Sequence, residues 1–384
     1  MSRRLLFVTG TRADFGKLVP LAQACGTNRF NVTFFITGMH MMKKYGETRR
    51  EVRGHVEFDF YEFVNQREGD SLELILAKTV LGLSDYLQEA RPDLVVIHGD
   101  RIEALAASIV CATLGIRSAH IEGGELSGSI DESMRHCNSK LCSSHFVSSE
   151  AAARILIAIG EHRSNIYCIG SPELDVHAEP SGVSIKEVKN YYNIKFNDYG
   201  IVMFHPVTSE RDSMRAQARS LFDALMTSQK SFVVIMPNND PGTEHIFAAI
   251  ESLPKHRFRI IPSMRFLYFS ELMRHASAMI GNSSAGVREA PFLGVPSLNI
   301  GSRQNSRARS PSITDCSAFD YDAIAEFLSR SWGKKFPRDF SFGTGNAATS
   351  FAQILNESEF WVQPLQKSFV RYPTTEGPST LCSI

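Results

Sequence analysis

The sequence is poor in cysteine, and its cysteines form no recognisable motif. Seven cysteines, an odd number, are scattered over 384 residues, and no Cys-x-x-Cys occurs. A disulfide framework and a zinc knuckle both need paired or closely spaced cysteines, so the sequence predicts neither. We expect reduced thiols and a cytoplasmic protein.

Long apolar runs and an excess of one charge are also missing. The apolar run at residues 5–8 stops at Thr9 and Gly10, which is too short for a signal peptide core or a membrane span. Lys plus Arg total 41 and Asp plus Glu total 41, so no bulk charge directs the chain to nucleic acid or an anionic membrane. We expect neither as a partner, and any anion must be bound by locally placed groups.

Short apolar runs alternate with amphipathic helical patterns along the whole chain, which predicts parallel sheets with buried strands. The rhythm breaks around residues 177–186 and then restarts. We therefore predict two doubly wound α/β domains, at residues 1–175 and 176–365, followed by a tail at 366–384. A ligand then lies between the domains, outside the carboxyl ends of the strands. The expected strands lie at residues 5–8, 32–36, 94–97, 118–121, 146–148, 201–204, 232–236, 259–261, 278–280 and 297–300, and the clearest helices at 72–87 and 102–114.

The loop at residues 9–17 follows the first expected strand and resembles a phosphate loop. It lacks the Gly-x-Gly-x-x-Gly and Gly-Lys-Ser/Thr spacings, so we expect no dinucleotide cofactor. Arg12 and Lys17 could meet an anion at the helix start, although solvated charges are the simpler interpretation. After a later strand, Asp100 stands where a helix N-cap belongs and Glu103 completes a capping box, with a functional role for Asp100 as the alternative.

A glycine-rich loop at residues 120–136 gathers carboxylates after another strand. Glu122, Glu125, Asp131 and Glu132 fall within eleven residues. Clustered acids can move protons on and off a substrate when their pKa values differ. The spacing differs from that of hard-cation loops, so we expect no metal, and a polar surface loop is the competing interpretation.

The second half supplies groups suited to phosphate. His205 ends a strand and could donate to a phosphate or a leaving oxygen. Ser283 and Ser284 open a helix with small residues, which indicates an anion cradle or a simple cap. Glu289 could reach a ribose, and Arg303 offers a forked cation for a diphosphate. Acids in one half and phosphate ligands in the other predict chemistry on a diphosphate-activated substrate.

Seven motifs in order then resemble one family. They are Gly-Thr-Arg-Ala-Asp-Phe-Gly-Lys at 10–17, His-Gly-Asp at 98–100, His-Ile-Glu-Gly-Gly-Glu-Leu-Ser-Gly at 120–128, Ile-Asp-Glu-Ser-Met-Arg-His at 130–136, Phe-His-Pro-Val-Thr at 204–208, Gly-Asn-Ser-Ser-Ala-Gly-Val-Arg-Glu at 281–289 and Gly-Ser-Arg-Gln at 301–304. The set is similar to the hydrolysing UDP-N-acetylglucosamine 2-epimerases of sialic acid biosynthesis. The resemblance covers most of residues 1–360.

The resemblance implies a glycosyltransferase-B-like fold with two Rossmann-like domains, a central cleft and no cofactor. It implies conversion of UDP-N-acetylglucosamine and water to N-acetylmannosamine and UDP, by anti elimination to 2-acetamidoglucal and then hydration. It also implies a homodimer or homotetramer. By motif position the resemblance implies three essential carboxylates, Asp100, Glu122 and Asp131. It places His205, Arg12 and Lys17 near the diphosphate, and it implies direct diphosphate contacts for Ser283, Ser284 and Arg303. It also implies a ribose contact for Glu289 and a place near the sugar for His40, and Glu132 stands where many members have Asp.

Four alternatives remain open. A hydrolysing 2-epimerase for UDP-2,4-diacetamido-2,4,6-trideoxyglucose, feeding legionaminic acid, would share the fold and the chemistry. A non-hydrolysing epimerase would return UDP to the glycal. A glycosyltransferase would need an acceptor groove, and a non-catalytic nucleotide-sugar sensor would not need Asp100, Glu122 and Asp131. The motifs also leave open which carboxylate is the base.

Overall fold

The computed structural model describes residues 2–26, 29–127, 130–237, 240, 242–305 and 307–371, and it contains two sheets of parallel strands. The first sheet has the order β3-β2-β1-β4-β5-β6-β7. Its strands are β1 (Arg3–Thr9), β2 (Phe30–Ile36), β3 (Asp59–Glu62), β4 (Leu94–His98), β5 (Ser118–Ile121), β6 (Ser144–Val147) and β7 (Ile166–Cys168). The helices that join them are α1 (Arg12–Cys25), α2 (Arg49–Arg53), α3 (Leu72–Ala90), α4 (Ile102–Leu114), α5 (Ile130–Leu141) and α6 (Glu150–Ala158), with short 3-10 turns η1 (Gly38–Met41), η2 (Lys43–Tyr45) and η3 (Arg163–Asn165).

The second sheet has the order β10-β9-β8-β11-β12-β13. Its strands are β8 (Gly200–Met203), β9 (Phe232–Ile235), β10 (Phe258–Ile261), β11 (Ala278–Gly281), β12 (Ser297–Ile300) and β13 (Ile313–Cys316). The remaining helices are α7 (Glu173–Ala178), α8 (Ile185–Tyr191), η4 (Thr208–Ser213), α9 (Met214–Thr227), α10 (Thr243–Glu251), α11 (Phe266–Arg274), α12 (Ser284–Val287), α13 (Glu289–Phe292), α14 (Tyr321–Arg330), α15 (Ala347–Asn356) and α16 (Ser358–Val362). The expected pair of doubly wound α/β domains is confirmed.

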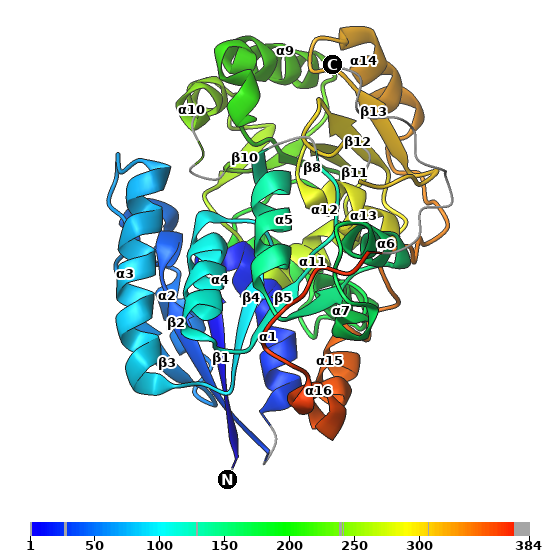
Figure 1. Ribbon diagram of the computed structural model, residues 1–384. Helices are drawn as coiled ribbons and strands as arrows, with labels where there is room; N and C mark the ends of the chain where they lie inside the picture. Colours follow the sequence, from blue (N-terminus) through cyan, green and yellow to red (C-terminus); the bar gives the residue numbers. More distant parts are fainter. Residues whose placement is uncertain are drawn as a thin grey trace, which may run out of the picture.

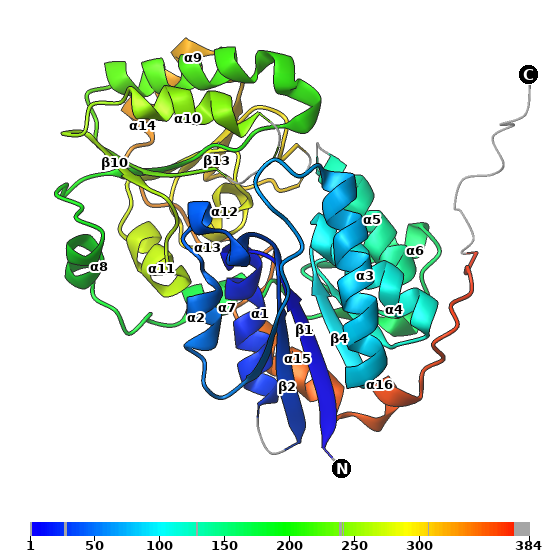
Figure 2. The same ribbon diagram turned by 90° about the vertical axis from the view of Figure 1, so that its left-hand side faces the viewer.

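Helices cover both faces of each sheet, which explains why the central strands are buried on both faces. On the first sheet, α3 and α4 cover one face, and α1 with α15 covers the other (Figures 1 and 2). Strand β5 and strand β6 are buried at every residue. Removing such side chains from water is the main stabilising contribution to the fold.

The strand order reverses direction at β1 and β4 in the first sheet, and at β8 and β11 in the second. At such a switch point the connections leave in opposite directions and open a crevice beyond the carboxyl ends of the strands. In Figure 2 the loops after β1 and β4 face the second domain. The fold therefore places the two predicted sets of site residues across one cleft.

The chain crosses between the domains twice, and the crossings touch. Gly170 and Gly343 both have positive φ, at 86° and 114°, and a Cβ on Gly343 would lie 2.8 Å from the Cα of Gly170. The amide of Ser171 donates to the carbonyl of Phe342 at 2.7 Å. Only glycine permits this approach, so the two connections form one narrow junction.

The C-terminal helices return to the first domain after the second crossing. Helices α15 and α16 lie beside the first domain (Figure 1). Phe351 and Phe360 on them are fully buried in one cluster with Phe7, Phe34 and Phe146. Residues 176–365 were predicted as one second domain, and the structure places α15 and α16 of that range on the first sheet. The division at residue 175 stays a prediction.

The predicted tail begins as a described segment that lies along the first domain. The amide of Val370 donates to the carbonyl of Gly160 at 3.0 Å, and Lys367 Nζ lies 2.5 Å from Glu161. The rest of the predicted tail, from Tyr372 onward, lies outside the residues that the structure describes. Within the described ranges, no helix has both the length and the apolar character needed to cross a membrane.

Candidate active site

A cavity of about 300 Å³ lies between the two domains at the carboxyl ends of the strands. Its walls combine charged and hydroxyl side chains with a few apolar ones. From the first domain come Thr11, Arg12, Asp14, Lys17, His98 and Asp100, and from the second come His205, Ser263, Phe266, Phe269, Ser283, Ser284, Glu289 and Arg303. Glu122, Asp131, Glu132 and His40 lie outside this lining.

The loop after β1 is held rigid by its own side chains. Thr11 caps α1 by accepting from the Asp14 amide at 3.2 Å, and Asp14 accepts from the Thr11 amide at 3.0 Å. This reciprocal capping box satisfies backbone donors that a helix start leaves free. Arg12 leaves the loop toward the second domain, where its guanidinium donates to Ser263 at 2.5 Å.

His40 lies behind this loop and is completely buried. Its Nε2 is 2.9 Å from the Thr9 hydroxyl and its Nδ1 is 2.7 Å from the Thr48 hydroxyl. Burial lowers the pKa of His40 to about 4, so the ring is neutral at physiological pH. In this geometry His40 supports the loop after β1.

The interpretation of Asp100 as a helix cap is wrong. Helix α4 begins at Ile102, its N-cap is Arg101, and no side chain makes a capping hydrogen bond there. The Asp100 carboxylate instead pairs with Arg135 of α5. Burial acts to raise the pKa of Asp100, but Arg135 and the guanidinium groups of Arg307 and Arg303 hold it at about 2. Asp100 is therefore an ionised carboxylate on the cavity wall.

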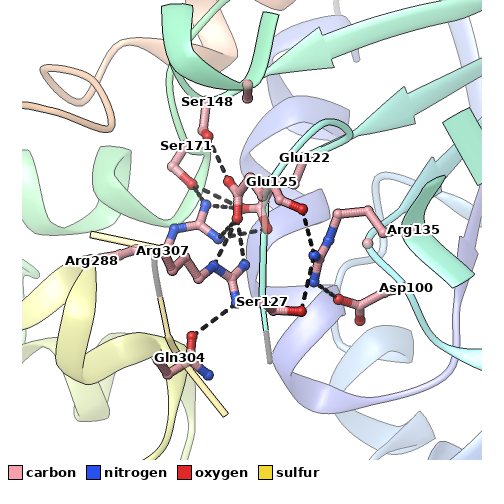
Figure 3. Close-up of polar contacts among 12 residues, drawn as sticks. Asp100, Glu122, Glu125, Ser127, Arg135, Ser148, Ser171, Arg288, Gln304 and Arg307 are labelled. Carbon is pink, nitrogen blue, oxygen red and sulfur yellow. Dashed lines mark hydrogen bonds and ion pairs between the residues drawn. The ribbon is translucent and has the colours of Figure 1, made fainter. Parts of the chain in front are cut away.

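Glu122 sits in a strained turn directly after β5, with φ of 63°. Its carboxylate accepts two hydrogen bonds from Arg288, at 2.8 and 2.5 Å (Figure 3). The same carboxylate lies 3.2 Å from Lys17. Burial opposes ionisation, yet Arg288 and Lys17 hold the pKa of Glu122 well below its ordinary value. Lys17, expected beside an anionic ligand, is thus paired with protein carboxylates while it also lines the cavity.

Two cationic partners of the acidic loop come from the second domain, and the sequence did not single them out. Arg307 contacts Glu125 through Nε at 2.9 Å and through Nη2 at 2.5 Å. Arg288 contacts Glu122 and Glu125, and Ser148 donates to Glu125 at 2.6 Å (Figure 3). The sequence did contain a signal for these partners. A buried loop with this many carboxylates needs cations nearby, and Arg288 and Arg307 follow strands of the other sheet.

Asp131 and Glu132 begin helix α5 beyond this network. Asp131 lies 3.4 Å from Arg303, an ion pair that joins the two domains. Glu132 accepts a hydrogen bond from the Ser127 amide. Gly128 and Ser129, which complete the predicted loop motif, lie outside the described residues.

In the second domain the candidate phosphate ligands are braced by neighbours. The Asn282 side chain accepts from the His205 amide at 2.7 Å and donates to the His205 carbonyl at 2.8 Å. Ser283 caps α12 by accepting from the Ala285 amide at 3.4 Å, so the capping interpretation holds for this residue. Glu289 lines the cavity with its carboxylate 2.6 Å from His177 Nε2.

The carboxylates Asp100, Glu122, Glu125 and Asp131 are each paired with an arginine of the protein. In the described part of the chain, no group of three or more His, Cys, Asp or Glu side chains could hold a metal ion. The arrangement offers ionised carboxylates on one side of the cavity and donors suited to phosphate on the other.

A family model described as UDP-N-acetylglucosamine 2-epimerase matches residues 23–356. The chain belongs to the UDP-N-acetylglucosamine 2-epimerase family. It is 44% identical over 375 residues to a UDP-N-acetylglucosamine 2-epimerase of Neisseria meningitidis, with 96% of this chain and 99% of that protein covered. It is 32% identical over 383 residues to a UDP-N,N'-diacetylbacillosamine 2-epimerase (hydrolyzing) of Legionella pneumophila, with 96% and 99% covered.

Solved structures of 2-epimerases share the fold. One is a UDP-GlcNAc 2-epimerase from Neisseria meningitidis bound to UDP-GlcNAc, with a TM-score of 0.76, 21% identity and 92% and 99% of the two chains covered. Another is the Methanocaldococcus jannaschii UDP-GlcNAc 2-epimerase in complex with UDP-GlcNAc and UDP, with a TM-score of 0.77, 19% identity and the same coverage. The expected glycosyltransferase-B-like architecture is confirmed.

Proposed function

We propose that this 2-epimerase hydrolyses UDP-N-acetylglucosamine to N-acetylmannosamine and UDP, the first step of sialic acid biosynthesis. The observation that supports this most is the pairing of first-domain carboxylates with second-domain cations at the domain junction, where Lys17 and Arg303 connect these pairs to the cavity. Arg288 reaches Glu122 at 2.5 Å, and Arg303 reaches Asp131 at 3.4 Å. A diphosphate leaving group needs the cations, and proton transfer at the sugar needs the acids.

The second domain is proposed to hold UDP. Side chains there combine hydroxyl donors, an imidazole and a forked guanidinium, all of which stabilise charge that grows on a departing diphosphate. Glu289 is proposed to accept from a ribose hydroxyl. The diphosphate ligands in this proposal are Ser283, Ser284, His205 and Arg303, with Arg12 and Lys17 from the first domain.

Asp100 is proposed as the base that removes the proton from sugar carbon 2. It is ionised and it lines the cavity, whereas Glu122 and Asp131 are not among the lining residues. The electron pair of the broken C–H bond forms the double bond to carbon 1, and the C1–O bond breaks toward UDP. A bound sugar must displace Arg135 from Asp100, and that displacement raises the basicity of the carboxylate.

Hydration of the glycal then needs an acid on the other face of the ring. Glu122 is proposed for this step, because it lies 3.2 Å from His98 Nε2 and 3.2 Å from Lys17 Nζ, and both of these residues line the cavity. Carbon 2 receives a proton while water adds its hydroxyl to carbon 1. The product is a free sugar with the opposite configuration at carbon 2.

The diacetamido sugar is the main rival substrate. The Legionella relative that acts on UDP-N,N'-diacetylbacillosamine is 32% identical, below the 44% of the Neisseria UDP-N-acetylglucosamine 2-epimerase. A polysialic acid biosynthesis protein of Escherichia coli is 28% identical over 345 residues. These similarities favour the N-acetylglucosamine substrate and the sialic acid pathway.

Incubation with either UDP sugar in deuterated water, followed by mass and NMR analysis, tests the proposal. The expected products are UDP and free N-acetylmannosamine with deuterium at carbon 2. UDP-N-acetylmannosamine in place of the free sugar would identify a non-hydrolysing epimerase. Turnover of the diacetamido sugar alone would assign the legionaminic acid route, and UDP release only with an added acceptor would indicate a glycosyltransferase.

We also propose that the enzyme works in the cytoplasm as a homodimer or homotetramer, as the family resemblance implies. Light scattering of the purified protein gives the mass of the assembly directly. The mass of a single chain would contradict this part of the proposal.

A further inference from the structure

The hydroxyl of Ser171 lies between two buried carboxyl groups. Its Oγ is 2.9 Å from Glu122 Oε1 and 2.8 Å from Glu173 Oε2. Arg288 Nη2 donates to the same oxygen. The three side chains that share the hydroxyl are all at most 3% exposed. No solvent therefore supplies the hydrogens of these contacts.

A serine hydroxyl has one hydrogen and can donate to only one of the two carboxyls. If both were ionised, the second contact would join two oxygens with no hydrogen between them. Such a contact is repulsive at 2.8–2.9 Å. One of the two carboxyls must therefore hold a proton and donate it to Ser171.

The proton belongs on Glu173. Glu122 accepts two hydrogen bonds from Arg288, at 2.8 and 2.5 Å, which favour its ionised form. Glu173 Oε1 has Arg288 at 3.1 Å and Lys17 at 3.4 Å, but it is buried and accepts no hydrogen bond. A neutral carboxyl tolerates that environment better than a charged one.

Charged groups from every neighbouring element face Glu173. Lys17 comes from α1, Glu122 from the turn after β5, Arg288 from between α12 and α13, and Glu289 from α13. Burial raises the pKa of Glu173, and the two carboxylates add to this effect against Arg288 and Lys17. The raised pKa of Glu173 agrees with the proton that the two Ser171 contacts require on this carboxyl.

We propose that Glu173 and Ser171 form a proton relay to Glu122. The proposal rests on the proposed function, in which Glu122 is the acid of the hydration step. The Glu173 proton moves to Ser171 Oγ while the Ser171 hydroxyl proton moves to Glu122. The charge left on Glu173 then lies beside Lys17 and Arg288. Glu122 gives its proton to carbon 2 of the glycal as water adds at carbon 1, and the proton that this water loses restores the relay.

The substitution Glu173→Gln distinguishes a proton-relay role of Glu173 from a purely structural role. The amide has the same shape and can donate to Ser171, but it cannot pass a proton on. We expect kcat to fall about tenfold or more, with KM nearly unchanged, and the basic limb of the kcat–pH profile to move to lower pH. A Glu173→Gln enzyme with the wild-type kcat and pH profile would overturn the relay.

Ser171→Ala removes the link between the carboxyls and should change the pH profile in the same way. The double variant should then lose no more activity than either single variant, because both changes break one path. Losses that multiply in the double variant would contradict a shared path. Glu161→Gln is the matched control, since Glu161 is equally buried and ion-paired to Lys140 and Lys367. Its kcat–pH profile should remain that of the wild type.

Infrared spectroscopy detects the proton on the Glu173 carboxyl without any turnover of substrate. The substrate-free enzyme at neutral pH should show the carbonyl band of a protonated carboxyl, and the band should be missing from Glu173→Gln. Absence of the band in the wild type would overturn the inference. Because the band does not depend on the reaction, failure to release free N-acetylmannosamine would count against the proposed function while the band still decides the state of Glu173.

Discussion

Arg288→Met should destabilise the protein strongly, because it removes the cation that three buried carboxyl groups share. Arg288 lies 2.5 Å from Glu122, 3.1 Å from Glu173 and 3.4 Å from Glu125 and is itself 1% exposed. Methionine fills a similar volume and leaves the carboxylates without this partner. Removing one member of a buried ion pair typically costs about 3–5 kcal/mol in the free energy of unfolding.

The expected change in melting temperature follows from this cost. A domain of about 150–250 residues loses roughly 2–4 °C for each kcal/mol, so Tm should fall by roughly 6–20 °C. Differential scanning calorimetry at neutral pH measures the shift directly. Arg288→Lys keeps the charge but loses the forked geometry, so its Tm should lie between those of the wild type and the methionine variant.

The pH dependence gives this prediction a second, independent test. Arg288 and Lys17 hold the pKa of Glu122 well below its ordinary 4.5 despite burial. A carboxyl with a lowered folded pKa adds stability above its unfolded pKa, and that stability is lost as pH falls. The Tm difference between wild type and variant should therefore be largest at neutral pH and shrink as the pH drops below about 4.5.

Arg330→Met is the control, because Arg330 forms a surface pair with Glu326 in which the side chains are 74% and 58% exposed. Such pairs contribute about 0–1 kcal/mol, so its Tm should stay close to that of the wild type. Equal melting of Arg288→Met and wild type at neutral pH would refute the reasoning. So would a Tm difference that stays constant from about pH 7 to about pH 4.

Three further changes test other parts of the structure. Asp100→Asn should lower kcat for UDP release by about 100-fold or more, while Asp223→Asn on the exposed face of α9 leaves it unchanged. Phe351→Ala should lower the free energy of unfolding by about 3–5 kcal/mol in denaturant titrations, because Phe351 is fully buried 4.7 Å from the Phe146 ring. Gly281→Ala should reduce folded yield and Tm, since φ is 128° there and a Cβ would collide with the Met203 carbonyl.

The sequence predicted the central strands because those strands are buried on both faces. Every apolar run that was interpreted as a strand coincides with one in the structure. The strands that were not predicted are β3, β7 and β13, and all three lie at sheet edges. Their side chains are partly exposed, with no fully buried position in any of them. An edge strand has fewer apolar neighbours, so its sequence often lacks an apolar run, although the edge strand β10 has one.

The path of the C-terminal helices could not be predicted from periodicity. Helix α15 has one apolar face, and that pattern is satisfied equally by either sheet. Its place on the first domain depends on the crossing at Gly343 and on contacts with Phe146 and α1. These are long-range contacts, which a local pattern does not encode.

The candidate site could be predicted as a set of residue types but not as a set of pairs. The interpretation of Asp100 as a cap considered only its own helix, and Arg135, 35 residues further on, takes the carboxylate instead. Arg288 and Glu122 are 166 residues apart and belong to different domains. Pairing of this kind is decided by how the two sheets face each other.

The buried charges at the domain junction are more readily explained by chemistry than by stability. Each buried ion costs several kcal/mol in desolvation, and well-packed apolar side chains often stabilise such a site equally well. Here the cations Arg288 and Arg307 belong to the second domain, and the carboxylates Glu122 and Glu125 belong to the first. Any change in the distance between the domains therefore changes the charge state that Glu122 prefers. In the proposed mechanism Glu122 holds a proton at one step and releases it at another, and this dependence ties its proton affinity to the distance between Glu122 and the Arg288 guanidinium of the other domain.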